Sequence, residues 1–359
     1  MTDTKKFDFN QAIEELDKSN MIGSIEQFGD QVQDVWEQAQ KVHFDDSYKN
    51  VNKVVVAGMG GSALGAHVIK SVFKNQLKVP VEICNDYTLP NYVDEKTLVI
   101  ASSYSGTTEE TISAFEDGIK KGAKITGITS GGKLGSILKE KGYPTLVFEV
   151  NYNPSNQPRM ALGYSVFGQI ALLSQAGLLS ISEEDYQQVL ETIAQSQMTL
   201  SRHVDLENNP AKLLAFNVVD RVPVITTAEH LTGSAHVMAN QINENSKNYS
   251  EIRVIPEINH HLMEGLQFPK SNTSNLLFFN VLSDLYLPKN QKRITITEQI
   301  MEKNDIVHIN HKLEAPTKLT QALELILFGS YTGFYLSMLN NQNPSPIPWV
   351  DLFKEQLKK

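Results

Sequence analysis

The sequence predicts an α/β protein of two domains, each built around a parallel β-sheet that helices cover on both faces. Three observations support this prediction. The chain has 359 residues, which is longer than one hydrophobic core usually extends. Short β-branched runs alternate with helical segments, and these runs are apolar throughout, as is typical of strands buried on both faces. The same rhythm begins again after residue 209.

The first half of the chain begins with residues 8–42, where apolar residues at helical spacing predict one or two amphipathic helices. Strand-like runs follow, separated by helical segments, at residues 53–58, 81–85, 97–103, 124–130 and 145–150. A loop of turn-forming residues at 151–158 then precedes a long apolar helical stretch at 160–179. We therefore place the domain boundary in this loop. Residues 1–152 form the N-terminal helices and the first domain, and residues 153–359 form the second domain.

The second half repeats the pattern with a helix at about 233–247 and another at about 319–339. Its strand-like runs are at residues 221–228, 251–257, 275–281 and 293–299. A proline-rich tail from residue 343 completes the chain. The similar rhythm of the two halves suggests a duplicated architecture.

The composition excludes several classes of partner. A net charge of −9 would repel nucleic acid and anionic lipid over most of the surface, so we expect no nucleic acid partner and no membrane association. The single cysteine, Cys84, excludes an intramolecular disulfide and fits a reducing compartment. Residues 1–11 lack the apolar run of a signal peptide, and no stretch approaches the roughly 18 apolar residues of a membrane span. We expect a cytoplasmic protein.

The first motif is a glycine-rich turn between a predicted strand and a predicted helix. Residues 54–65 read VVVAGMGGSALG. Such a turn brings backbone N–H groups and a helix N-terminus to an anion. The turn also fits the loose dinucleotide-binding pattern G-x-G-x-x-G/A, with Glu82 or Asp86 as a ribose ligand. A phosphate loop, a dinucleotide loop and a structural tight turn therefore remain open at this point.

The second motif favours a phosphate monoester. Residues 102–111 read SSYSGTTEET, so five serine and threonine hydroxyls stand before the first turn of a predicted helix. One hydroxyl would be enough to cap that helix. Several neutral hydroxyls beside a glycine, at the end of a second parallel strand, can surround a phosphate with hydrogen bonds. A dinucleotide site does not require this second loop.

These two loops resemble the first sugar isomerase (SIS) domain of the bifunctional phosphoglucose/phosphomannose isomerase family. The resemblance continues, in the family's order, to the C-terminus. Residues 158–164 (PRMALGY) are similar to the family's P-R-x-x-L-G-Y, and residues 240–247 (NQINENSK) to its N-Q-x-N-E-N-x-K. Residues 256–260 (PEINH) are similar to its P-E-x-N-H, and the tail blocks 343–347 and 351–354 to its C-terminal element.

The resemblance implies two SIS domains, each a doubly wound parallel sheet of the flavodoxin-like αβα sandwich type. The active site would lie in the cleft between them, at the carboxyl ends of the strands. It also implies no metal and no other cofactor. The residues that would hold the substrate phosphate are Gly60, Gly61, Ser62, Ser103, Ser105 and Thr108. In this family a histidine crosses a dimer interface, so the resemblance implies a homodimer with composite active sites.

The same resemblance assigns four catalytic residues. Glu244 would move the proton between C1 and C2, and Arg159 would lie beside the enediol. His260 would assist ring opening, and Lys354 would contact the ring or chain oxygens. These residue types suit the chemistry, because isomerisation needs a base over C1 and C2 and a cation beside the developing negative charge. An imidazole suits the proton transfers of ring opening.

The chain departs from the family at residues 259–265, which read NHHLMEG where the family has N-H-N-E-I-x-G. We choose His260 because it directly follows Asn259, but His261 remains an alternative. Near the C-terminus, the apolar Ile347 stands where single-substrate relatives have a bulky polar residue. This difference predicts that mannose 6-phosphate is accepted.

The predicted function is the interconversion of glucose 6-phosphate and mannose 6-phosphate with fructose 6-phosphate through a cis-enediol. The partner would be a small sugar phosphate. Two alternatives remain: a non-catalytic regulator that binds sugar phosphates, and an enzyme acting on amino-sugar or fructosamine phosphates. The first is weakened because the short acidic N-terminal segment leaves no room for a basic DNA-binding domain.

Overall fold

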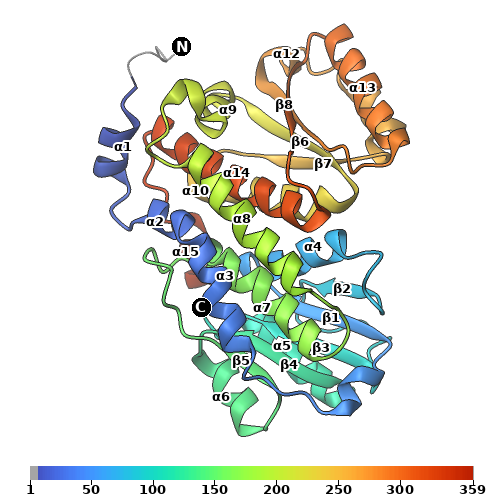
Figure 1. Ribbon diagram of the computed structural model, residues 1–359. Helices are drawn as coiled ribbons and strands as arrows, with labels where there is room; N and C mark the ends of the chain where they lie inside the picture. The colour runs from blue at the N-terminus through green and yellow to red at the C-terminus, as the bar shows by residue number, and fades with distance from the viewer. Residues whose placement is uncertain (1–6, 359) are drawn as a thin grey trace.

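The computed structural model describes residues 7–358 and contains two parallel β-sheets flanked by helices (Figure 1). The strand order is β2-β1-β3-β4-β5 in the first sheet and β7-β6-β8-β9 in the second. The strands are β1 (Lys53–Gly58), β2 (Val81–Cys84), β3 (Thr97–Ser102), β4 (Lys124–Thr129), β5 (Thr145–Val147), β6 (Val222–Ala228), β7 (Glu251–Ile255), β8 (Leu276–Leu282) and β9 (Val307–Lys312). The predicted α/β class with two parallel sheets is confirmed. Residues 1–6, part of the segment used to judge the signal peptide, lie outside the described residues.

Three helices precede the first strand, where the sequence predicted one or two. The helices of the first half are α1 (Phe9–Leu16), α2 (Met21–Glu26), α3 (Phe28–Ala39), α4 (Gly61–Val72), α5 (Glu109–Lys120), α6 (Gly132–Glu140) and α7 (Leu162–Gln175). The long helix predicted at 160–179 is represented by α7, which packs against α3 and α4. It therefore lies with the first sheet although it follows residue 152. The boundary between the domains stays a prediction.

The helices of the second half include the predicted segments near 233–247 and 319–339. They are α8 (Glu183–Leu200), α9 (Pro210–Val218), α10 (Thr232–Ser246), α11 (Leu262–Gly265), α12 (Asn272–Asn275), α13 (Pro288–Lys303), α14 (Lys318–Leu339) and α15 (Pro348–Leu357). Short 3-10 turns precede several of them, among them η2 (Pro158–Met160) and η5 (Glu257–His260).

One predicted strand is wrong. Residues 293–299 alternate β-branched and polar residues, but they lie inside α13. The buried residues of this helix are Asn290, Ile294, Thr297 and Met301, which recur at the spacing of a helix face. Pro288 at its first position favours helix initiation. The fourth strand of the second sheet is β9, which the sequence analysis missed because its sequence, VHINHK, is polar and lies at the sheet edge.

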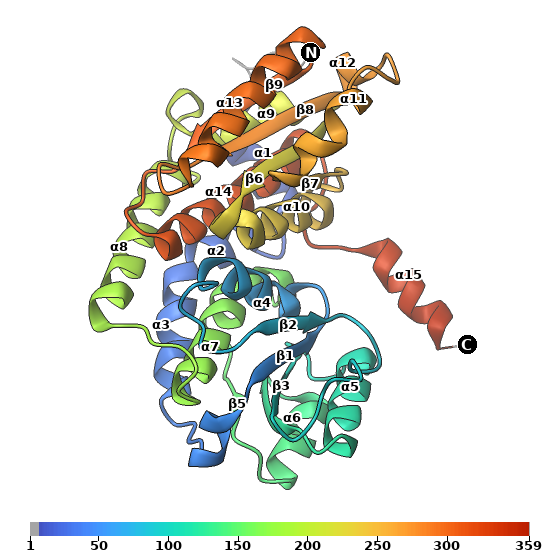
Figure 2. The same cartoon turned by 90° about the vertical axis from the view of Figure 1, so that its right-hand side faces the viewer.

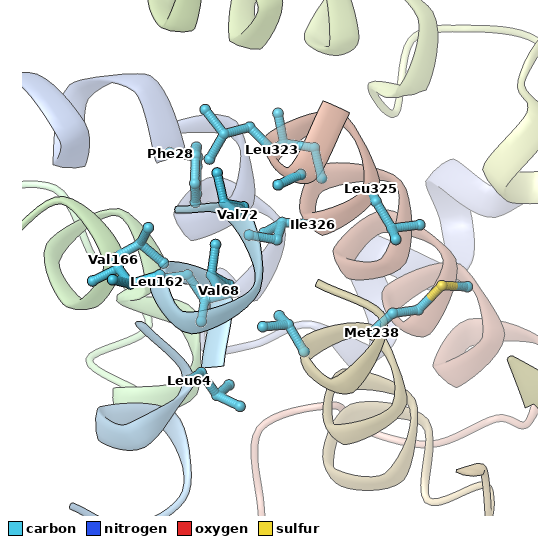
Figure 3. Close-up of a cluster of buried hydrophobic side chains, with 14 of the residues drawn as sticks. Phe28, Leu64, Val68, Val72, Leu162, Val166, Met238, Leu323, Leu325 and Ile326 are labelled. Atoms are coloured by element: carbon cyan, nitrogen blue, oxygen red, sulfur yellow. The ribbon is translucent and has the colours of Figure 1, made fainter. Parts of the chain in front are cut away.

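A continuous hydrophobic core joins the two sheets. Helix α14 lies at its centre and contacts α8, α9 and α10. Figure 3 shows Val68 and Val72 of α4 on the side of α14 that carries Leu323 and Ile326. By length and composition alone α14 could cross a membrane, but most of it is buried inside this core. A buried core helix meets the same criteria.

Helices α4 and α10 approach closely where the two halves of the chain meet. A Cβ added to Gly233 would lie 2.2 Å from the carbonyl oxygen of His67, so only glycine fits at this position. Nearby, the imidazoles of His67 and His236 are in contact, with their centroids 4.3 Å apart and their planes at 32°. Burial, and then the neighbouring His236, lower the pKa of His67 to about 4. Both rings therefore belong to the interface between the two halves as neutral groups.

The pKa of His67 predicts acid sensitivity. Between pH 6.5 and 4 the unfolded state binds a proton at His67 more readily than the folded state. The free energy of unfolding should therefore fall as the pH drops through this window. His67→Phe keeps an aromatic ring, and should lose about 1–2 kcal/mol less than the wild type between pH 7 and pH 4.5 in urea unfolding. Equal losses in the two proteins would contradict this prediction.

Candidate active site

The glycine-rich loop lies at the carboxyl end of β1 and leads directly into α4. Gly60 has a φ of 49°, a left-handed conformation that favours glycine. A Cβ added to Gly61 would lie 3.1 Å from the Cα of Arg159 and 3.1 Å from the carbonyl oxygen of Pro158. The absence of a side chain at Gly61 therefore lets the backbone of η2 pack against this loop.

The hydroxyl-rich loop lies beside it, at the carboxyl end of β3, because β1 and β3 are neighbouring parallel strands. The Oγ of Ser103 lies 2.9 Å from the Oγ1 of Thr108, and that of Ser105 lies 3.0 Å from the Oγ1 of Thr107. Thr108 is the N-cap residue of α5, and its side chain accepts no capping hydrogen bond. The first N–H groups of α5 are therefore not satisfied by this side chain.

The two loops are tied together through Ser62. Its Oγ accepts a hydrogen bond from the backbone N–H of Tyr104, at 2.8 Å. Its carbonyl oxygen accepts one from the Oγ of Ser102, at 2.7 Å. All six residues predicted to hold a phosphate lie at these adjacent strand ends. Hydroxyls, backbone N–H groups and two helix N-termini are the groups that bind anions in proteins.

Arg159 lies in η2 and its side chain is buried, with 4% exposed. Its Nε donates to the Oδ1 of Asn245 at 2.7 Å, and its Nη1 to the Oε1 of Gln157 at 3.0 Å. Its Nη2 donates to two carbonyl oxygens of the tail, those of Pro344 (2.8 Å) and Ser345 (2.7 Å). Four of the five N–H groups of the guanidinium therefore have partners, and one N–H of Nη1 remains.

Glu244 lies near the end of α10, and its Oε2 is 3.7 Å from the Nε of Arg159. Burial raises the pKa of Glu244, while the positive charges of Arg159, Lys247 and Lys354 oppose this rise. About a third of the side chain is exposed, so the carboxylate can reach a ligand. A half-buried carboxylate with a raised pKa beside a buried cation is suited to moving a proton.

Lys247 is a functional candidate that the sequence analysis did not select. It ends α10 in a left-handed conformation, and its Nζ donates to the carbonyl oxygens of Glu244 (2.6 Å) and Pro344 (3.2 Å). Burial, and then the charge of Arg159, lower its pKa to about 8. Lys247 belongs to the same NQINENSK block as Glu244, and this position could have identified it as a candidate.

Lys354 lies on α15, whose residues up to 358 are all exposed. Figure 2 shows this helix extending away from both sheets. Lys354 still acts electrostatically on Glu244, and Asp351 of the same helix acts on Arg159. The structure therefore places α15 near the Arg159–Glu244 pair without a hydrogen bond from Lys354.

His260 lies at the end of η5 and is exposed. Within residues 7–358 it forms no hydrogen bond or ion pair. The neighbouring His261 pairs with Glu257, its Nε2 lying 2.7 Å from the Oε2. The choice between the two histidines stays a prediction.

The remaining histidines of this region belong to the interior. His230 is buried, and its Nε2 lies 3.0 Å from the Oε1 of Gln321. His236 contacts His67 as described above. Over the part of the chain that the structure describes, no three or more His, Cys, Asp or Glu side chains are grouped so that they could hold a metal ion.

Comparisons with known proteins agree with this arrangement. Residues 47–178 match the SIS domain family, and residues 207–357 match the bacterial phospho-glucose isomerase C-terminal SIS domain. The chain is 33% identical to the bifunctional phosphoglucose/phosphomannose isomerase of Caldicellulosiruptor bescii, over 94% of this chain and 98% of that protein. It is 30% identical to the protein of the same name from Aquifex aeolicus, over 85% of this chain and 90% of that one.

The fold is also found in a crystal structure of a hypothetical protein from Thermus thermophilus. The TM-score is 0.75, and the match covers 97% of this chain and 92% of that one. The sequences are 16% identical, so this likeness concerns the fold alone.

Proposed function

Because the chain belongs to the bifunctional phosphoglucose/phosphomannose isomerase family, we propose that its Arg159–Glu244 site interconverts glucose 6-phosphate and mannose 6-phosphate with fructose 6-phosphate. The observation that carries this proposal is the 3.7 Å pair of Glu244 and Arg159 beside the glycine-rich loop. The pair supplies a base and a cation within reach of a sugar whose phosphate lies at the loops.

The phosphate is held by Gly60, Gly61, Ser62, Ser103, Ser105 and Thr108. Their hydroxyls and backbone N–H groups, with the N-termini of α4 and α5, stabilise a dianion without a charged side chain in the loops. Because the phosphate is fixed, C1 and C2 of the sugar are held at a set distance from the loops. Binding energy from this remote group positions the reacting carbons over Glu244.

The proton is moved by Glu244. The carboxylate removes the proton from C2 of the aldose, or from C1 of fructose 6-phosphate, and returns it to the other carbon of the planar enediol. The hydroxyl proton passes from O2 to O1 in the first direction and from O1 to O2 in the second. The remaining N–H of Arg159 stabilises the oxygen that becomes negative. Glu244 can return the proton to either face of C2 when the enediol turns about its C2–C3 single bond, and the apolar Ile347 in the tail does not oppose acceptance of both epimers.

Ring opening requires a proton to leave O1 and another to reach O5. We assign these steps to His260 and Lys354, as the family resemblance implies, with His261 as the alternative imidazole. Because Lys354 lowers the pKa of Glu244, Lys354→Met should also move the acidic limb of the kcat/KM profile to higher pH. An acidic limb that stays in place would show that Lys354 does not act on Glu244.

The function is tested by incubating the purified protein with fructose 6-phosphate in EDTA and following the two aldose phosphates separately. We expect both glucose 6-phosphate and mannose 6-phosphate. Product formed from glucosamine 6-phosphate instead would favour the amino-sugar alternative. Binding of fructose 6-phosphate without any product would favour the non-catalytic regulator.

We also propose a homodimer in which His260 of one protomer completes the site of the other, in a cytoplasmic protein. Two observations support the dimer. His260 is exposed, and it forms no hydrogen bond or ion pair within residues 7–358. Helix α15 exposes large apolar side chains, with Trp349 80% and Phe353 62% exposed. Apolar side chains in such numbers on one helix are typical of a surface that another chain covers.

Composite sites predict complementation between inactive variants. Mixing Glu244→Gln and His260→Ala protomers should restore about a quarter of the wild-type activity, because half of the dimers are mixed and each has one intact site. The mixture is measured after the two variants are unfolded and refolded together. A mixture that stays as inactive as its components would contradict the composite site. Lys18→Ala, a surface substitution, is unfolded and refolded in the same way as the control.

A further inference from the structure

A second cavity lies between α13 and the segment formed by η5 and α11. Its volume is about 430 Å³, and it is lined by Asn259, Met263, Lys289, Lys292, Arg293, Ile296 and Ile300. Figures 1 and 2 both show α13 at the opposite end of the molecule from α5 and α6. Within one chain the cavity is therefore separate from the loops of the first sheet.

Three cations line one side of this cavity. Lys289, Lys292 and Arg293 stand on successive turns at the start of α13, and none of them forms an ion pair with a carboxylate of residues 7–358. The chain as a whole carries a net charge of −9. Three cations without acidic partners repel one another, so their grouping at one cavity is stabilised when an anion binds between them.

The rest of the cavity lining is mainly apolar. Met263, Ile296 and Ile300 give the cavity an apolar face, and 44% of Ile296 is exposed. Asn259 of η5 is hydrogen-bonded to α13, since its Oδ1 accepts from Arg293 at 3.3 Å and its Nδ2 donates to Thr297 at 2.8 Å. These hydrogen bonds hold η5 against α13, so part of the cavity lining is fixed before a ligand binds.

We propose that this cavity binds a small organic phosphate, with the phosphate among the three cations and the carbon skeleton against the apolar wall. A cavity of this volume accommodates a molecule of metabolite size, and sites for such ligands combine apolar walls with a few polar groups. Arg293 offers the planar donors that suit a phosphate, and the two lysines supply point charges. The site goes beyond the proposed isomerase function and does not depend on it.

The probe for this site is phenyl phosphate, which joins a phosphate dianion to an apolar ring. Calorimetric titration of the full chain should detect a site that Lys289→Gln/Lys292→Gln/Arg293→Gln weakens at least about tenfold. The control is Lys120→Gln/Lys139→Gln/Lys141→Gln, which removes the same charge from exposed positions of the first domain and should bind as the wild type does. This comparison separates the cavity from the phosphate loops, which both variants retain.

A second variant tests the apolar wall. Ile296→Asn should reduce the preference for phenyl phosphate over inorganic phosphate by about fivefold, with inorganic phosphate binding unchanged. Equal binding of phenyl phosphate by wild type and triple variant would overturn the proposal. A triple variant that binds as before but dissociates into monomers in gel filtration would also overturn it, and would make the cavity part of a subunit interface.

Discussion

Glu244→Gln is expected to lower kcat for fructose 6-phosphate by roughly 10³-fold, because an amide cannot accept the proton from carbon. The substitution preserves the size of the side chain, and the buried surroundings that raise the pKa of Glu244 tolerate a neutral group. KM should change little if, as proposed, the two loops that hold the phosphate supply most of the binding. Steady-state kinetics with both aldose phosphates and with fructose 6-phosphate measure the effect.

The control for this substitution is Glu324→Gln. Glu324 is also a partly buried carboxylate with a raised pKa, but it accepts hydrogen bonds from the backbone N–H groups of Glu314 and Ala315. This variant should lose stability and keep its kcat. A Glu244→Gln protein that retains more than about a tenth of the wild-type kcat would require another base. Lys247, with a pKa of about 8, would then be the next candidate.

The positions of the glycine-rich and hydroxyl-rich loops could be predicted from the sequence because each lies within one strand–turn–helix unit. The residues from Ser102 to Thr108 are close in sequence, and the parallel pairing of β1 with β3 brings the second loop to the first. Such local patterns, combined with the rule that parallel strands end at one edge, are sufficient to place the loops. The prediction failed where the local pattern was ambiguous, as in residues 293–299, where tertiary packing overrides β-branched propensity.

The surroundings of Arg159 could not be predicted, because they come from distant parts of the chain. The carbonyl oxygens of Pro344 and Ser345 are 185 and 186 residues away from it in sequence. Backbone carbonyls carry no residue-specific signal. No sequence motif therefore predicts that carbonyl oxygens of the tail accept hydrogen bonds from a buried guanidinium. The place of His260 could not be derived either, since its exposed imidazole has no hydrogen-bond or ion-pair partner among residues 7–358.

Arg159→Lys is expected to lower both activity and stability, although it keeps the positive charge. A lysine ammonium cannot reproduce the fork that donates to Asn245 and to two tail carbonyls at once. Buried acceptors left without donors destabilise a protein by about 1–3 kcal/mol each. We therefore expect a loss of about 3 kcal/mol in the free energy of unfolding, measured by urea titration.

The kinetic effect of Arg159→Lys should exceed what lost stability explains. In assays at a temperature where the variant is fully folded, kcat should fall by about 10²-fold, because the charge no longer faces the enediol oxygen at a fixed distance. The control is Arg202→Lys, since Arg202 pairs with Glu26, which has no proposed role in the reaction, and this variant should keep its kcat. A variant that is destabilised but fully active when folded would restrict Arg159 to holding the tail. In that case the stabilising charge at the enediol would have to come from Lys247, whose Nζ already contacts the carbonyl oxygen of Glu244.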